Sequence, residues 1–156
     1  MLETPTIIKT EAQSAAVIRL TIPREEIQNV MGPGIMELMS TLGSQGVSPA
    51  GPLFSHHLRM DPGIFDFEIG VPVNGPFTPS GRVEQGLLPA ATVARTVYSG
   101  PYEELGDAWG EFGEWIASEG HESAADLWEC YLSGPESGTD SSKWQTQLNR
   151  PLLRIG

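Results

Sequence analysis

A short internal repeat constrains the fold of this 156-residue chain more than any other feature. The segment PREEI at residues 23–27 resembles PYEEL at residues 101–105. In both, a proline suited to the first helical turn precedes acidic residues that favour the positive end of a helix. Each segment follows an apolar, strand-like run with an internal arginine, Arg19 or Arg95, and precedes a helical stretch and two further strand-like runs. The order β-α-β-β therefore occurs twice, which favours a duplicated fold.

Hydrophobic periodicity locates the elements. Apolar side chains at spacings of three and four predict helices over residues 24–42 and 101–118, and Gly32-Pro33-Gly34 is expected to kink or split the first. Strands are expected at about residues 52–59, 64–73, 126–133 and 144–152. Three glycines in the second helix predict close packing against another backbone or a bound group: Gly106, Gly110 and Gly113.

These elements predict one domain over residues 1–156, with pseudo-repeats at about 5–74 and 82–153 that join near residues 75–82. The expected fold class is α+β, in which the two β-α-β-β repeats form an antiparallel sheet. The helices are expected on one face of the sheet and a ligand groove on the other. The segment 133–142, rich in Ser, Gly and Asp, is expected to be a loop.

Charge narrows the class of partner. The chain has 20 acidic residues against 9 basic ones, a formal net charge of -11. Such a surface repels phosphate backbones and anionic membranes, so neither nucleic acid nor a membrane is expected as a partner. A cationic or neutral ligand is easier to accommodate, although the same charge also serves solubility alone. The N-terminus lacks the pattern of a signal peptide and no apolar run has transmembrane length, so a cytoplasmic location is expected.

Metal and cofactor chemistry is not expected. Cys130 is the single cysteine, which excludes an intramolecular disulfide and a cysteine-rich zinc site. His56 and His57 are adjacent on a predicted strand and would point to opposite faces, which disfavours chelation of one metal. No phosphate-binding loop, dinucleotide fingerprint or nucleophile elbow is present.

Alternation along the predicted strand 126–132 yields the main candidate site. Trp128, Cys130 and Leu132 share one face, which we interpret as core beneath the helices. Glu129 and Tyr131 share the opposite face with Leu127, and would project together toward the groove. A carboxylate beside a phenol there can neutralise a bound cation or act in acid–base chemistry, whereas a solvated strand face is the structural alternative.

Two further groups are candidates for lining the groove. On the predicted strand 64–73, Asp66 and Glu68 share the face opposite Phe65, Phe67, Ile69 and Val71, and line the groove or face solvent. Aromatic side chains gather in the second half of the chain, and Trp109 and Tyr102 among them suit the walls of a site for flat, lipophilic ligands. The alternative is that they belong to the core.

Motifs along nearly the whole chain resemble the GyrI-like family, the effector-binding domain of many AraC- and MerR-type regulators, which also exists alone in bacteria. The likeness is carried by VYSGPYEEL at 97–105, Ala108-Trp109, Trp115, WECY at 128–131, WQTQ at 144–147 and Pro151-Leu152, with DFEIGVP at 66–72 in the first half. It implies that Glu129 lies at the centre of a drug-binding groove beside Tyr131. Two departures, Gly134-Pro135 for Asp-Pro and Thr146-Gln147 for Thr-Glu, imply different charge near that groove.

The resemblance implies two main functions. The first is a stand-alone protein that binds lipophilic, often cationic, aromatic compounds through Glu129, Tyr131, Glu68, Asp66, Trp109 and Tyr102. The alternative is a hydrolase of cyclopropane-containing, DNA-alkylating natural products, in which Glu129 and Tyr131 are catalytic. A protein-interaction role such as gyrase inhibition is a third option. A chain of 156 residues is expected to leave no room for a DNA-binding helix-turn-helix beside the fold.

Overall fold

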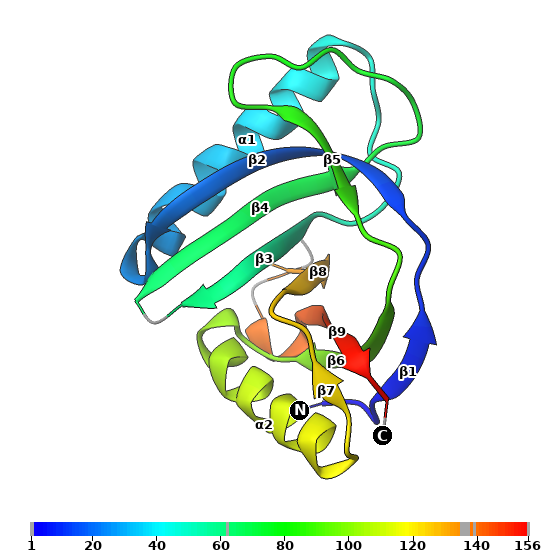
Figure 1. Cartoon of the computed structure of the whole chain (residues 1–156). Coiled ribbons are helices and arrows are strands. Elements are labelled where there is room, and N and C mark those ends of the chain that lie inside the picture. The colour runs from blue at the N-terminus through cyan, green and yellow to red at the C-terminus, as the bar shows by residue number, and fades with distance from the viewer. Residues whose placement is uncertain (1, 62, 135–137, 139, 156) are drawn as a thin grey trace. The chain divides into compact units, whose positions relative to one another are not determined.

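The computed structural model describes residues 2–61, 63–134, 138 and 140–155, and the backbone divides into two compact units. The inner unit is Glu11–Ala90, and the terminal unit combines Met1–Thr10 with Ala91–Gly156. The inner unit contains β2 (Gln13–Pro23), the 3-10 turn η1 (Arg24–Glu26), α1 (Ile27–Ser44), β3 (Phe54–Asp61), β4 (Ile64–Pro72) and β5 (Glu84–Leu88). The terminal unit contains β1 (Thr6–Lys9), β6 (Thr92–Ser99), η2 (Tyr102–Glu104), α2 (Leu105–Ser118), β7 (Glu122–Ser123), β8 (Leu127–Ser133), η4 (Ser141–Lys143) and β9 (Gln145–Arg154) (Figure 1).

The inner unit is an antiparallel sheet in the order β3-β4-β2-β5, with α1 packed along β4 and β2. Alternation places Phe67 and Ile69 of β4 on the side that meets α1, where both are fully buried. Leu38 and Leu42 of α1 close this core. Gly34 lets α1 approach the sheet, because a Cβ there would lie 2.7 Å from Ile69 Cδ1.

The terminal unit repeats this arrangement. Its strands follow the order β1-β6-β9-β8, and β7 adds a short pairing with β9. The apolar stripe of α2 is buried against Ala94 and Tyr98 of β6 and Leu148 of β9. That stripe consists of Leu105, Ala108, Phe112 and Ile116.

The two units confirm the duplicated β-α-β-β order and the α+β class. In each unit, the strand before the helix pairs with the last strand of the repeat. That last strand also pairs with the middle strand of the repeat. Each unit has one further edge strand: β5 pairs with β2, and β1 pairs with β6. The compact units differ from the pseudo-repeats predicted at 5–74 and 82–153. Strand β1 belongs to the terminal unit and strand β5 to the inner unit, so each edge strand joins the opposite half of the chain.

Details of the helices differ from the sequence prediction. Both begin with a 3-10 turn that carries the acidic residues of the repeat. Pro33 lies inside α1, which continues as one helix from Ile27 to Ser44 rather than splitting. Neither helix in the described part of the chain has the length and hydropathy of a membrane span. Of the predicted loop at 133–142, residues 135–137 and 139 lie outside the described residues.

The prediction that the α2 glycines pack closely against another backbone is wrong, whereas the alternative of a bound group stays a prediction. A Cβ at Gly106, Gly110 or Gly113 would meet no atom within 4 Å, so these positions face open space. Glycine loses more backbone conformational entropy on folding than alanine does, so these three residues destabilise α2. None of the described contacts of α2 requires a glycine at these positions.

This contrast predicts opposite effects of the same substitution in the two helices. Gly110→Ala is expected to raise the free energy of unfolding by about 1 kcal/mol, because alanine favours the helix and meets no clash. Gly34→Ala is expected to lower it, because its Cβ would press on the fully buried Ile69. Urea unfolding of both variants measures the difference, and equal shifts in the two would contradict the packing of α1.

A buried imidazole predicts acid sensitivity of the inner unit. The His57 ring stacks on Phe67 with centroids 5.1 Å apart and meets Phe65 edge-on at the same separation. Its Nδ1 is buried without a hydrogen-bond partner among the described residues. Burial lowers the pKa of His57 to about 4, with smaller contributions from the charges of His56 and Arg24.

Because the folded chain resists protonation of His57 and the unfolded chain does not, stability is expected to fall as the pH drops from about 6.5 toward 4. The loss attributable to this group is roughly 2 kcal/mol at about pH 5. His57→Phe keeps an aromatic ring in the stack and removes the titration. Unfolding curves at neutral and acidic pH are expected to show a smaller acid loss in the variant than in the wild type.

Candidate functional site

A carboxylate held by two aromatic donors is the main feature of the terminal unit. Glu129 lies on β8, half-buried. Its Oε2 accepts a 2.6 Å hydrogen bond from Trp109 Nε1 of α2, and its Oε1 accepts a 2.8 Å bond from the Tyr131 hydroxyl of the same strand. These are short contacts of the kind made to a charged acceptor. Neither donor carries a charge, and together the two bonds orient the Glu129 carboxylate.

Two further aromatic rings extend this arrangement. Tyr102 of η2 meets Tyr131 edge-on at a centroid distance of 5.9 Å, and it contacts Trp144 at 5.0 Å. Tyr102 is 37% exposed, so the aromatic surface reaches solvent. We call Tyr102, Trp109, Glu129, Tyr131 and Trp144 the Glu129 cluster.

The prediction that Glu129 and Tyr131 project away from the helix is wrong. Glu129 pairs across the strands with Leu148, whose side chain lies in the core beneath α2. Residues directly opposite each other in a ladder share one side of the sheet, so Glu129 faces α2 and reaches Trp109. The expected groove on the opposite face therefore does not contain this carboxylate.

The side chains of β8 that were predicted to lie beneath the helix lie on the opposite side of the sheet. Trp128 pairs with Asn149 and Cys130 with Gln147, on the side away from α2. Trp128 and Cys130 are buried there nonetheless, whereas Leu132 is exposed. Strand alternation grouped the side chains correctly, but it does not state which group meets the helix.

The two acidic candidates of β4 lie in the inner unit and on the side away from α1, as alternation predicted. Asp66 is buried and accepts two bonds from Arg19, at 3.2 Å from Nε and 3.0 Å from Nη2, and one from Thr21. Glu68 Oε1 lies 4.0 Å from His56 Nδ1. Asp66 is thus already neutralised by a guanidinium, which favours a structural role for it; a ligand contact for either residue stays a prediction.

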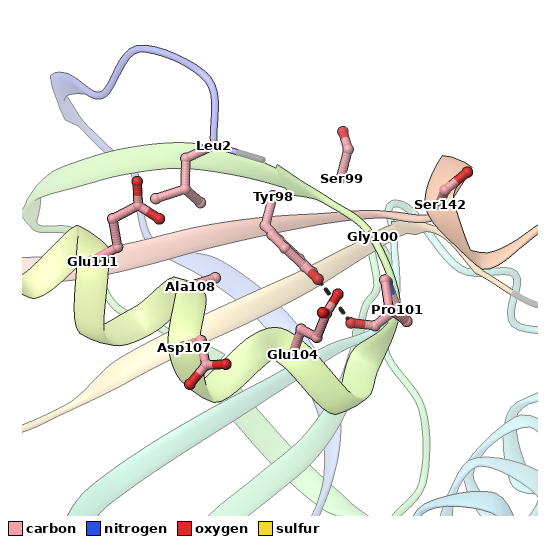
Figure 2. A pocket seen from close by; sticks show the side chains of 10 residues that line it. All are labelled: Leu2, Tyr98, Ser99, Gly100, Pro101, Glu104, Asp107, Ala108, Glu111 and Ser142. Carbon is pink, nitrogen blue, oxygen red and sulfur yellow. Dashed lines mark hydrogen bonds between the residues drawn. The ribbon is translucent and has the colours of Figure 1, made fainter.

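An acidic pocket beside α2 was missed by the sequence reasoning. Figure 2 shows it, with Glu104, Asp107 and Glu111 along the helix and Tyr98 at its centre. Its volume is about 340 Å³, and all its lining residues belong to the terminal unit. The three carboxylates recur at spacings of three and four on one helix flank, and this spacing is the signal that could have indicated it.

Tyr98 is a structural member of this pocket. Its hydroxyl donates a 2.9 Å hydrogen bond to the Pro101 carbonyl, drawn in Figure 2, and its side chain is buried. Burial raises the pKa of Tyr98, and the negative charges of Glu104, Asp107 and Glu103 raise it further. The phenol therefore stays protonated and caps the turn that leads into α2.

A family model for the GyrI-like small molecule binding domain matches residues 3–152. The chain belongs to the GyrI-like family. This membership confirms the resemblance seen in the sequence, and the match extends over both compact units of the GyrI-like chain. No curated protein sequence matches it.

Solved structures share the fold at low sequence identity. The EcmrR C-terminal domain has a TM-score of 0.85 at 19% identity, with 97% of this chain and 98% of that chain covered. In the EcmrR–DNA complex, the TM-score is 0.84 at 18% identity and this chain spans 58% of the length of EcmrR. SAV2435 bound to tetraphenylphosphonium has a TM-score of 0.67 at 14% identity, with coverages of 96% and 94%. A hydrolase from Listeria innocua has a TM-score of 0.66 at 13% identity, with coverages of 95% and 91%.

Two features of this GyrI-like chain bear on its chemistry. Of the two departures from the family pattern, Gln147 lies on β9 and accepts a 3.2 Å bond from Asn149, whereas Pro135 lies outside the described residues. Among the described residues, no group of three or more His, Cys, Asp or Glu side chains is arranged to hold a metal ion.

The environment of Cys130 predicts an unreactive thiol. Burial raises its pKa to about 11, with Arg95 acting in the opposite direction and Glu129 adding to the increase. Because the thiolate is the nucleophile, Cys130 is expected to react with a disulfide reagent at pH ~8 far more slowly than it does in urea-unfolded protein. Thiol titration of the folded and unfolded chain measures this, and equal rates would contradict the burial of Cys130.

Proposed function

We propose that this chain binds lipophilic aromatic cations, with the Glu129 cluster as the site of recognition. The observation that carries the proposal is the carboxylate of Glu129, oriented by Trp109 and Tyr131 and bordered by the exposed ring of Tyr102. A negative charge beside aromatic faces attracts a flat cation by two routes, Coulomb attraction and the cation–π interaction. Trp109 and Tyr131 orient this carboxylate as neutral donors.

Two other observations support the proposal. The family is one of small-molecule-binding domains, and one protein of the same fold, SAV2435, has been seen bound to tetraphenylphosphonium, a lipophilic aromatic cation. The net charge of -11 favours the approach of cations over anions. We expect affinity in the micromolar range, which corresponds to roughly -8 kcal/mol.

The Glu129–Tyr131 hydrogen bond also supports a second candidate, the hydrolysis of cyclopropane-containing alkylators. A carboxylate 2.8 Å from a phenol has the geometry to orient water while the hydroxyl assists as an acid. One protein of the same fold is described as a hydrolase. Binding remains the first proposal because the Trp109 bond and the adjoining rings serve recognition in either case.

Glu129→Gln tests the role of the charge. Glutamine can accept from Trp109 through its oxygen and donate to the Tyr131 oxygen through its amide, so it removes the charge while both contacts persist. We expect the variant to weaken tetraphenylphosphonium binding by roughly 1–3 kcal/mol. Binding of neutral triphenylphosphine oxide is expected to change little. Titration monitored by tryptophan fluorescence measures both affinities.

Glu114→Gln is the matched control, because Glu114 is an exposed acid of α2 outside the Glu129 cluster. It makes the net charge of -11 less negative by the same single unit, and it is expected to leave cation affinity unchanged. If both variants weaken binding alike, the effect is one of overall charge and the proposed site is wrong. If wild type consumes a cyclopropane-bearing alkylator and Tyr131→Phe retains binding but loses turnover, the hydrolase is the function instead.

A further inference from the structure

A half-buried arginine lies on the other side of the terminal sheet from the Glu129 cluster. Arg95 of β6 pairs with Asn149 of β9, and its neighbour Ala94 faces the α2 core, so Arg95 lies on the side away from α2. Its Nε donates a 2.6 Å hydrogen bond to Asn149 Oδ1. Asn149 is fully buried, which fixes the orientation of the guanidinium.

The same amide orients a second donor. Asn149 Nδ2 donates a 3.2 Å bond to Gln147 Oε1, two residues away on the same side of β9. The Gln147 amide also carries Nε2, which can donate hydrogen bonds. Gln147 is half-buried and sits diagonally across the ladder from Arg95, within reach of a long side chain.

Arg95 belongs, with Arg24 and Arg150, to the described arginines that have no ion pair with a described carboxylate. Arg19, Arg82 and Arg154 each lie within 4 Å of a carboxylate. Among the described residues Arg95 has no such ion pair, in a chain with 20 acidic residues. Burial lowers the pKa of Arg95, and the Cys130 thiol is the group that acts against this decrease. The guanidinium thus carries a partly desolvated charge, and no carboxylate of the described residues forms an ion pair with it.

We propose that Arg95 and Gln147 form a binding site for the carboxylate of a small monoanionic ligand. The planar guanidinium presents its remaining N–H donors as a fork that matches two carboxylate oxygens, and the Gln147 amide supplies a further donor. A single negative charge is compensated by one arginine, whereas a dianionic phosphate adds repulsion in this acidic chain. This site is independent of the Glu129 cluster, since the side chains occupy opposite sides of the sheet.

Benzoate is the probe, with benzamide as its neutral counterpart and inorganic phosphate as the dianion. Titration of the isotope-labelled full chain is expected to shift backbone amide resonances of β6 and β9 around residues 95, 147 and 149, in a saturable manner with benzoate alone. Arg95→Gln is expected to weaken benzoate binding about tenfold or more, which is about 1.4 kcal/mol. Arg82→Gln removes an arginine that is paired with Glu37, and is expected to leave binding unchanged.

Gln147→Glu provides a second test that keeps the Asn149 bond, because the introduced carboxylate can still accept from Nδ2. It places an internal carboxylate beside Arg95 and is expected to exclude benzoate, again by about tenfold or more, while the chain stays folded. The proposal is overturned if benzoate causes no saturable shift, or if Gln147→Glu or a folded Arg95→Gln binds like the wild type. Equal binding of benzamide or phosphate overturns the assignment to carboxylates.

Discussion

The antiparallel pairing of β9 with β6 on one edge and β8 on the other fixes the side of the sheet that each functional side chain occupies. Leu148 is the reference point, because it is fully buried beneath α2 and lies opposite both Thr96 and Glu129. A shift of one residue in the register of β6 or β8 against β9 would move the side chains of the shifted strand to the opposite side of the sheet. It would place Trp128 and Cys130 toward the helix and move Glu129 away from Trp109. The burial of one leucine in this register thus holds the carboxylate against its donors.

The terminal sheet consequently has two sides of opposite chemical character. On the side of α2, Glu129 is oriented by neutral aromatic donors, and the acidic pocket at Glu104, Asp107 and Glu111 adjoins the same helix. On the other side, Arg95 is oriented by the amide of Asn149. The inner unit differs, because there Arg19 and Asp66 neutralise each other. The Arg19–Asp66 pair lies in the inner unit, whereas Glu129 and Arg95 lie on opposite sides of the terminal sheet.

Much of the architecture could be predicted because it depends on local patterns. The repeated proline–acid segment marks the start of each helix, and the spacing of apolar residues gives the helix and strand positions to within a few residues. The pairing of β1 with β6 was not predicted, because an edge strand contributed from the far end of the chain leaves no periodic signal. The open surroundings of Gly106, Gly110 and Gly113 were misread for a related reason, since a small residue looks the same in a tight contact and in open space.

By itself, the sequence determined that Glu129 and Tyr131 share one side of a strand and that Trp109 and Tyr102 belong to one helical segment, because side-chain direction follows from the backbone period. The tertiary structure alone decided that these two pairs meet. The period of a strand separates its two faces but does not say which face a helix covers, which is settled by the pairing of Glu129 with Leu148. The short bonds from Trp109 and Tyr131 to Glu129 therefore depend on contacts between residues far apart in the chain.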